Sequence, residues 1–292
     1  MKNRKGIILA GGNGTRLSPV TKSISKQLLP IYNKPMIYYS LSVLMLSNIR
    51  DILIISQSNF LPLYKNLFGD GSDLGLNIKY ETQNDPNGIP EAFLIGENFI
   101  DKDPVALVLG DNIFYGSSLS GQLQQANLNS NASIFCTNVS NKSEFGILEY
   151  DDLGNPTKII EKPINSKSNY AVTGLYFYPN DVIDVTKNLK PSNRGELEIT
   201  DINNYYIFNK SINIIKLYRG TLWLDAGTFE NLHQCSSIIY NLEKNSNIMI
   251  GCLEEISLQK KWISAEQCLK LISDLKENEY TSYLKKIVNN YE

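Results

Sequence analysis

The sequence Leu-Ala-Gly-Gly-Asn-Gly-Thr-Arg at residues 9–16 is the stretch on which the expected fold depends. It follows an apolar run at residues 6–10, which is typical of a buried parallel strand. Glycines let backbone N–H groups approach an anion, and Arg16 adds a permanently charged guanidinium that matches phosphate oxygens. The loop has neither the Gly-Lys-Ser/Thr of a Walker loop nor the Gly-x-Gly-x-x-Gly spacing of a dinucleotide site. Taken alone, it is compatible with a structural turn as well as with a phosphate site.

Strand-like and helix-like segments alternate around this loop. Further strands are expected at residues 51–55, 76–81 and 105–109, and helices from Pro35, over 60–68, from Pro90 to about Ile100, and over 117–129. This alternation predicts an α/β fold with a Rossmann-like, mostly parallel central sheet flanked by helices. Short strands around residues 133–138, 147–150 and 158–160, and a long one at 171–178, predict a smaller antiparallel region. A charged loop at 193–201 leads into a helix, and segments near 229–244, 264–276 and 279–290 predict a helical C-terminal region.

Composition excludes several classes of function. A formal net charge of −2 over 292 residues gives no global attraction to nucleic acid. No apolar stretch approaches the roughly 20 residues that a membrane helix needs. The apolar run behind the basic N-terminus is short and leads straight into the glycine loop, which argues against a signal peptide and favours the cytoplasm. The four widely spaced cysteines are expected to be buried thiols in a reducing compartment.

The chain has a single histidine, His233, inside a predicted helix, where a packed or surface role is expected. Chemistry therefore falls to carboxylates, lysine, arginine or a metal. Asp111 follows the apolar strand at 105–109, and Asp225 repeats this strand-end pattern of aspartate and glycine. Doubly wound sheets place ligand chemistry at the carboxyl ends of their strands. By position alone, Asp111 is equally compatible with capping the next helix.

Together these segments resemble the glucose-1-phosphate thymidylyltransferases, members of the sugar-phosphate nucleotidyltransferase superfamily. The resemblance runs over nearly the whole chain and rests on residues 9–16, 25–39, 107–116, 169–178, 195–201 and 224–228. It implies that dTTP and glucose 1-phosphate react to give dTDP-glucose and pyrophosphate, through in-line attack of the sugar phosphate on the α-phosphorus. Positioning and charge neutralisation dominate such chemistry.

The resemblance also implies Mg²⁺ as cofactor, a homotetramer, and a role in the synthesis of dTDP-rhamnose or other deoxysugars for cell-surface polysaccharides. It divides the chain into a core of residues 1–228 and a helical region of residues 229–292 for packing or oligomerisation. Within the core, residues 1–131 are expected to bind the nucleotide and residues 132–228 the sugar phosphate.

Individual roles follow from the same resemblance. Arg16 and Lys26 are the expected phosphate cations, and Asp111 and Asp225 the expected magnesium ligands. The remaining nucleotide contacts are expected from Leu9, Gly11, Gly12, Gly14, Thr15, Gln83 and Gly88. The sugar-phosphate contacts are expected from Gly146, Glu161, Lys162, Thr173 and Arg194. Considered individually, Arg16 and Lys26 are compatible with solvated surface cations, Glu161 with an ordinary strand-end carboxylate, and Trp223 with a core residue.

The sequence departs from the family pattern in two regions. Pro90 replaces the small residue common after the base-reading turn, which predicts a shifted loop with binding retained. Near a regulatory nucleotide site known in the family, Ser117 replaces a histidine and Gln259 an arginine. Losing a cation weakens charge-assisted hydrogen bonds to a diphosphate, so feedback inhibition by dTDP-rhamnose stays an open question.

Three other functions remain as alternatives. One is a relative that uses UTP or another hexose 1-phosphate. Thymine differs from uracil by one methyl group, and a pocket for that group is worth only about 1–3 kcal/mol of discrimination. A non-catalytic nucleotide-sugar sensor should have lost a strand-end carboxylate or a phosphate cation, whereas all are present here. A nicotinamide dehydrogenase is disfavoured because its glycine spacing is absent.

Overall fold

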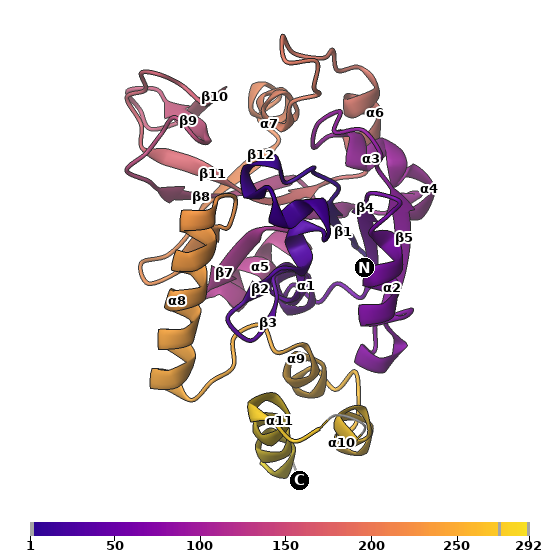
Figure 1. Cartoon of the computed structure of the whole chain (residues 1–292). Helices are drawn as coiled ribbons and strands as arrows, with labels where there is room; N and C mark the ends of the chain where they lie inside the picture. The colour runs from indigo at the N-terminus through magenta and orange to yellow at the C-terminus, as the bar shows by residue number, and fades with distance from the viewer. Residues whose placement is uncertain (1–2, 274–275, 291–292) are drawn as a thin grey trace.

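A mixed sheet forms the centre of the molecule (Figure 1). The structure is a computed structural model that describes residues 3–273 and 276–290. Within these residues the sheet has nine strands: β1 (Lys5–Ala10), β4 (Asp51–Ser56), β5 (Asn77–Thr82), β6 (Val105–Leu109), β8 (Ala132–Asn138), β9 (Gly146–Tyr150), β10 (Pro156–Glu161), β11 (Tyr170–Tyr178) and β12 (Ile212–Lys216). Their order is β10-β9-β11-β6-β1-β4-β5, with β8 beside β11 and β12 beside β8.

The parallel half of the sheet contains β6, β1, β4 and β5. Leu9 of β1 lies in register with Leu109 of β6 and with Ile55 of β4. The apolar residues of β1, β4 and β6 are almost all buried, as expected of strands covered on both faces. This register brings the loops that follow β1 and β6 to the same edge, and it confirms the predicted Rossmann-like sheet.

The antiparallel half is organised by β11, which runs antiparallel to β6, β8 and β9. Strands β9 and β10 form a hairpin, and Asp151 caps its turn by accepting the main-chain N–H groups of Leu153 and Asn155. The predicted antiparallel region is therefore confirmed. Strand β12, which pairs in parallel with β8, was not predicted.

Helices cover both faces of the sheet. One face carries α1 (Ile37–Leu46), α2 (Leu61–Phe68) and α5 (Leu119–Leu128), whose apolar side chains join one buried cluster. The other face carries α3 (Glu91–Ile95), α4 (Glu97–Ile100), α6 (Val182–Lys187) and α7 (Ile199–Phe208), which contribute to a second cluster. Figure 1 shows α3, α6 and α7 above the sheet and α1 and α5 below it.

Three predicted helix boundaries need correction. The helix expected from Pro90 to about Ile100 is divided into α3 and α4 at Gly96, where a β-carbon would lie 3.0 Å from the carbonyl oxygen of Ala92. Helix α1 begins at Ile37, not at Pro35, because β2 (Pro30–Ile31) and β3 (Lys34–Pro35) first form a short hairpin. Helix α7 begins at Ile199, within the expected charged loop.

The C-terminal region is helical, with α8 (Phe229–Ser246), α9 (Leu253–Gln259), α10 (Ala265–Ser273) and α11 (Glu279–Asn289). Helix α9 was not predicted. The end of the helical segment expected at 264–276 lies partly outside the described residues. Among the helices that are described, none is long and apolar enough to cross a membrane. Cys136, Cys235, Cys252 and Cys268 are all buried and free.

Candidate active site

The glycine loop and Asp111 lie at one edge of the sheet because β1 and β6 are adjacent parallel strands. After β1 the backbone adopts a left-handed conformation at Gly14, with φ of 59°, and continues into the short 3-10 helix η1 (Thr15–Leu17). The hydroxyl of Thr21 donates to the carbonyl oxygen of Gly14 at 2.9 Å. Packing also favours glycine at position 14, because a β-carbon there would lie 2.9 Å from a methyl group of Thr21.

Lys26 forms an ion pair with the carboxylate of Asp111, which joins two predicted site residues. Burial raises the pKa of Asp111, but the ammonium group of Lys26 and hydrogen bonds from Lys26 and Asn112 outweigh burial and lower it. The residues beside Lys26 are fixed in the interior, where the hydroxyl of Ser25 contacts the Tyr64 hydroxyl at 2.7 Å. Asp111 is therefore ionised and held beside a cation.

Asp225 approaches Asp111 through a second small sheet. Strands β7 (Asn112–Tyr115) and β13 (Leu222–Asp225) pair antiparallel, with Asp225 opposite Asn112, and the N–H of Ala226 donates to the carbonyl oxygen of Asp111 at 3.1 Å. Burial and the neighbouring charge of Asp111 raise the pKa of Asp225 to about 6. Its Oδ1 is buried and, among the described residues, has no hydrogen-bond partner. Two carboxylates from separate strand ends are thus brought together, as predicted.

Arg16 lies beside the same carboxylate. A β-carbon at Gly227 would lie 2.9 Å from Nη2 of Arg16 and 2.9 Å from Oδ1 of Asp225. The positive charge of Arg16 lowers the pKa of Asp225, but burial and the charge of Asp111 have the larger effect, so the pKa stays raised. Gly227 therefore leaves the space in which Arg16 and Asp225 approach each other.

A cation fits this pair of carboxylates. Coordinating oxygens without partners are what a hard divalent ion requires, and the buried Oδ1 of Asp225 is such an atom. Among the described residues, no group of three or more His, Cys, Asp or Glu side chains could hold a metal by itself. The remaining ligands would therefore come from water and substrate phosphates, which is the usual arrangement for Mg²⁺.

The predicted base-reading residues lie together at the end of β5. Gln83 packs against Gly11 of the glycine loop and donates to the carbonyl oxygen of Gly88 at 3.4 Å. Gly88 adopts φ of 107° and pairs with Leu197, whose backbone would overlap any β-carbon at position 88. The structure thus explains glycine at 88 by this backbone approach. Among the described residues, and apart from its two chain neighbours, no atom lies within 4 Å of a β-carbon built at Gly12, so packing does not explain that glycine.

The predicted sugar-phosphate residues form a second cluster around Glu161. Arg194 Nη2 lies 3.6 Å and Lys162 Nζ lies 3.8 Å from Glu161 Oε1, while the hydroxyl of Thr200 donates to Oε2 at 2.8 Å. Gly146 pairs with Glu161 across the β9–β10 hairpin. The two cations and the carboxylate are therefore neighbours, although 32 residues separate Lys162 from Arg194 in the sequence numbering.

Thr173 has a different environment from the other predicted sugar contacts. Its side chain is fully buried, and its hydroxyl donates to the carbonyl oxygen of Phe135 at 3.1 Å. This hydrogen bond joins β11 to β8. Because the whole residue is 0% exposed, neither its side chain nor its backbone lies at an accessible surface.

Two residues of the site were not predicted. The amide of Asn112 donates to Asp111 Oδ1 at 3.0 Å, and its oxygen accepts from Trp223 Nε1 at 2.6 Å and from Gly174 N at 3.0 Å. Tyr176 is buried, and burial together with the charges of Glu161 and Asp111 raises its pKa. It therefore lies near both Glu161 and Asp111. The glycine that interrupts β11 at position 174 was the available signal for the Asn112 contact.

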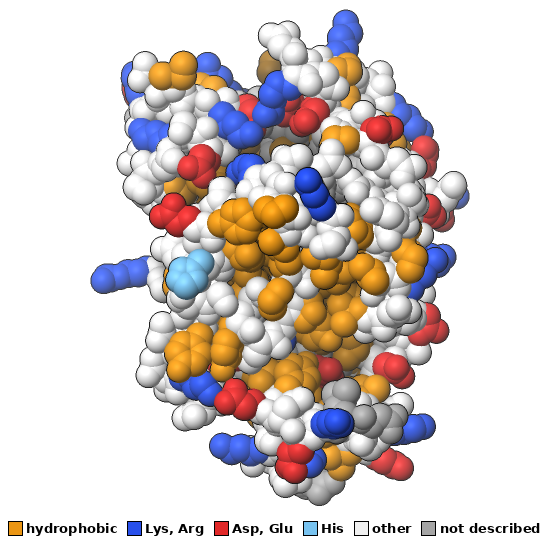
Figure 2. Space-filling model, in the orientation of Figure 1, with side chains coloured by type: hydrophobic (Ala, Val, Ile, Leu, Met, Phe, Trp, Pro, Cys, Tyr) orange, Lys and Arg blue, Asp and Glu red, His pale blue; other side chains and the backbone are white. Residues whose placement is uncertain are grey.

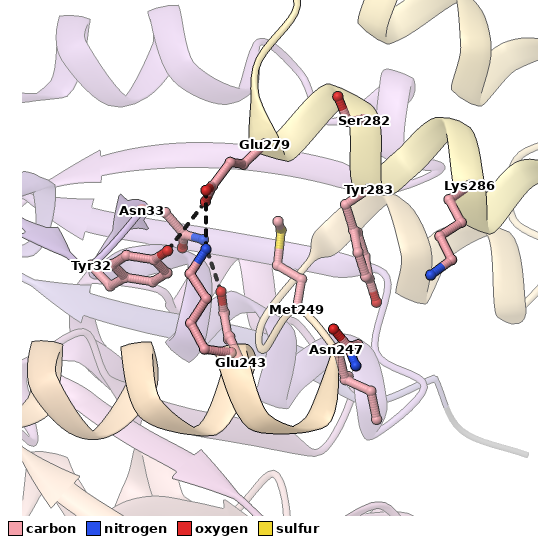
Figure 3. A pocket seen from close by; sticks show the side chains of 11 residues that line it. Tyr32, Asn33, Glu243, Asn247, Met249, Glu279, Ser282, Tyr283 and Lys286 are labelled. Carbon is pink, nitrogen blue, oxygen red and sulfur yellow. Dashed lines mark hydrogen bonds and ion pairs between the residues drawn. The ribbon is translucent and has the colours of Figure 1, made fainter.

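Two cavities border residues named above, and a third lies apart from them. One of about 500 Å³ borders Asp225 and is also lined by Glu144 and Trp223. One of about 190 Å³ contains Gln259, whose amide donates to Glu255 at 3.0 Å. A third, of about 380 Å³, lies between the β2–β3 hairpin, α8 and α11 (Figure 3) and includes none of the predicted catalytic residues.

The third cavity adjoins the anchor of the C-terminal region. Glu243 of α8 accepts hydrogen bonds from Lys34 at 2.9 Å, Asn33 at 2.8 Å and the main-chain N–H of Ile250 at 2.8 Å. The buried Lys34–Glu243 ion pair joins the hairpin that follows the Lys26 segment to α8. Helix α8 itself begins at Phe229, shortly after the strand that ends at Asp225, so both ends of this helix lie near segments of the site.

The chain belongs to the nucleotidyl transferase family, whose model matches residues 5–241. Its curated relatives include glucose-1-phosphate thymidylyltransferases. That of Neisseria meningitidis serogroup A is 49% identical over 285 residues, which cover 97% of this chain and 99% of the relative. That of Mycobacterium tuberculosis strain H37Rv is 47% identical over 280 residues, covering 96% and 97%. The predicted resemblance is thereby confirmed.

Solved structures agree with this fold. A provisionally named glucose-1-phosphate thymidylyltransferase from Bacillus anthracis, in complex with a sucrose, matches with a TM-score of 0.74 and 37% identity, over 80% of this chain and 94% of that one. A UDP-glucose pyrophosphorylase complexed with UDP-glucose matches with a TM-score of 0.72 over 82% and 99%. At 24% identity, the second likeness concerns the fold alone.

Proposed function

We propose that this chain is an enzyme that forms dTDP-glucose and pyrophosphate from dTTP and glucose 1-phosphate. One observation carries the proposal. Asp111 and Asp225 come from two strand ends and meet between the cations Lys26 and Arg16. A sensor would not need this pair, whereas a reaction between two phosphorylated substrates needs both a metal site and charge neutralisation.

Asp111 and Asp225 would hold Mg²⁺, which supplies Lewis-acid stabilisation of the phosphate charge when it is bound. Arg16 and Lys26 neutralise the triphosphate and favour departure of pyrophosphate. An oxygen of glucose 1-phosphate attacks the α-phosphorus in line, a new P–O bond forms, and the bond between the α-phosphorus and the bridging oxygen of the leaving pyrophosphate breaks. The protein contributes mainly position and charge.

Different groups of residues would bind the ends of the two substrates. Gln83, Gly88 and Gly11 would bind the thymine end, and the glycine loop with Leu9, Gly12, Gly14 and Thr15 the nucleotide phosphates. Lys162 and Arg194 would hold the sugar phosphate, and Glu161 would accept from glucose hydroxyls. The charges of both Glu161 and Asp111 act on Tyr176, so the sugar-phosphate cluster lies near the expected metal ligands, which supports this assignment because the two substrates must meet there.

The nucleotide-binding part is proposed to span about residues 1–131 and the sugar-phosphate part about 132–228, with residues 229–292 serving packing and oligomerisation. We propose a homotetramer, supported by the hydrophobic side chains that gather on one face between α8 and α2 (Figure 2). Light scattering after size-exclusion chromatography tests this state. A cytoplasmic enzyme that supplies dTDP-glucose for deoxysugars of cell-surface polysaccharides is the role proposed for the whole chain.

Pyrophosphate release tests the activity directly. The protein is assayed with dTTP and with UTP, each against a panel of hexose 1-phosphates and with added Mg²⁺. We expect the highest kcat/KM with dTTP and glucose 1-phosphate, and loss of release in Asp225→Asn. The matched control is Asp152→Asn, which changes an exposed carboxylate in the β9–β10 turn. Absence of release with every pair would reject the proposal in favour of a sensor.

A further inference from the structure

Glu91 fixes the side chain of Gln83 from the opposite side to the glycine loop. Gln83 is only 4% exposed and follows the last residue of β5. Its Nε2 donates to Glu91 Oε2 at 2.6 Å, and the other oxygen of Glu91 accepts from Asn87 Nδ2 at 2.8 Å. Glu91 is the first residue of α3, so its main chain is fixed by the helix. Both carboxylate oxygens are thus used to hold the base-reading turn.

A carboxylate at position 91 allows only one orientation of the Gln83 amide. The two ends of an amide are alike in shape but opposite in hydrogen bonding, since the NH₂ group donates and the oxygen accepts. An ionised carboxylate only accepts, and so does the nearby carbonyl oxygen of Gly88. The NH₂ group must therefore face Glu91 and Gly88. This leaves Oε1, an acceptor, against Gly11 at the start of the glycine loop.

We propose that Glu91 is a positioning residue that selects the nucleotide base through Gln83. The inference rests on the proposed role of Gln83 as a base contact. An acceptor at Oε1 pairs with the N3–H of thymine or uracil in a nucleotide bound beside the glycine loop. Cytosine has an acceptor at N3, so the two lone pairs would face each other and neither group would gain a hydrogen bond. A site that is built to hydrogen-bond one group rejects the analogue that lacks it, because the buried polar atom is then left unpaired.

Glu91→Gln tests the proposal with almost no change of shape. The introduced amide can accept from or donate to Gln83, so both orientations of the Gln83 amide become available. We expect the ratio of dissociation constants for dCTP and dTTP, measured by calorimetry on the full chain, to fall about tenfold. Because a base contact is equal in the ground and transition states, the KM for dTTP should rise while kcat stays unchanged. Glu91→Ala also frees the amide and should lower the same ratio.

The matched control and a rescue separate orientation from general damage. Glu97→Gln changes an exposed carboxylate of the next helix, which pairs with Lys187, and should leave the ratio unchanged. In the double variant Gln83→Glu with Glu91→Gln, the donor lies at position 91 and an acceptor-only group faces the base. This exchange should restore the preference for dTTP, whereas a merely structural role for Glu91 predicts no rescue.

Gln83→Ala distinguishes failure of this inference from failure of the base-site assignment. If Gln83→Ala lowers the ratio but Glu91→Gln and Glu91→Ala do not, Gln83 reads the base and the positioning role of Glu91 is wrong. If Gln83→Ala leaves the ratio unchanged, Gln83 does not read the base, and both the assignment and the inference are overturned. Pyrophosphate release by the wild-type protein with dTTP and glucose 1-phosphate is measured separately, so failure of the proposed function is distinguished from failure of this inference.

Discussion

Asp225 lies directly opposite Asn112 in the β7–β13 pair, so its carboxylate meets that of Asp111, the residue before Asn112. This register has an energetic cost for the folded protein. Burial and the neighbouring negative charge both oppose ionisation of Asp225 and raise its pKa. The arrangement is unfavourable without a cation and favourable with one, which makes it suited to binding a metal only where substrate phosphates complete the coordination.

Asp225→Asn should stabilise the metal-free protein while removing its activity. In the folded protein the pKa of Asp225 is about 6, compared with 3.8 for an unperturbed aspartate. At pH values between 3.8 and 6, the folded state therefore binds more protons than the unfolded state. Its contribution to the free energy of unfolding therefore falls as the pH rises through this window, by up to about 3 kcal/mol at 1.36 kcal/mol per pKa unit. Thermal unfolding at pH 4 and pH 7 in the presence of chelator checks this: the gain in Tm should be clear at pH 7 and small at pH 4. A lower Tm at pH 7 would contradict it.

Mg²⁺ should stabilise the wild-type protein and not Asp225→Asn. An ion that binds only the folded state adds RT ln(1 + [L]/Kd), about 2.7 kcal/mol at a hundredfold excess over Kd. Titration of Mg²⁺ in the presence of dTTP, followed by Tm, provides the measurement. Asp152→Asn, which changes an exposed turn carboxylate, should respond as the wild type does. An equal response in Asp225→Asn would remove this residue from the metal site.

Asn112→Ala should weaken activity because Asp111 loses a hydrogen bond, and it should also change the fluorescence of Trp223. The substitution removes a donor to Asp111 and the acceptor of the indole N–H. A lost buried hydrogen bond costs about 1–3 kcal/mol, and we expect kcat/KM to fall about tenfold. In a Trp262→Phe background Trp223 is the remaining tryptophan of the two in the sequence, and its emission should shift to longer wavelength as water replaces the amide.

The control for this change is Asn241→Ala, an exposed residue whose amide donates to the carbonyl oxygen of Ser237 within α8. It should leave both the activity and the emission unchanged. If Asn112→Ala altered stability but left kcat/KM intact, its contact with Asp111 would be structural only.

The sequence patterns located the strands of the parallel half because β1, β4 and β6 are continuous apolar runs, each ending in a polar or glycine-rich loop. The strand-end rule then made Asp111 a candidate without any knowledge of its neighbours, although its position alone was equally compatible with capping the next helix. Short elements carry less information, and the two-residue strands β2 and β3 have no periodicity to detect. Helix α9 has only seven residues, too few for two full turns of an amphipathic pattern.

Contacts between distant segments could not be predicted in the same way. The side-chain oxygen of Asn112 accepts hydrogen bonds from Trp223, 111 residues later, and from Gly174, 62 residues later. No local sequence pattern indicates either partner. Gly88 was expected to contact the nucleotide, but no local pattern indicated that the backbone of Leu197 is its neighbour in the structure. Such partners become visible only when the crossovers of the sheet are known.

Lys162→Ala should weaken binding of the sugar phosphate without affecting the nucleotide. Lys162 follows the last residue of β10 and lies beside Glu161 and Arg194, in the cluster proposed to bind glucose 1-phosphate. Removing one cation should raise the KM for glucose 1-phosphate about tenfold, equal to about 1.4 kcal/mol, and leave the KM for dTTP unchanged. Lys158→Ala, which removes an exposed lysine from the same strand, is the matched control. A fall in kcat at unchanged KM would place Lys162 in transition-state stabilisation, and no change in either would exclude it from the site.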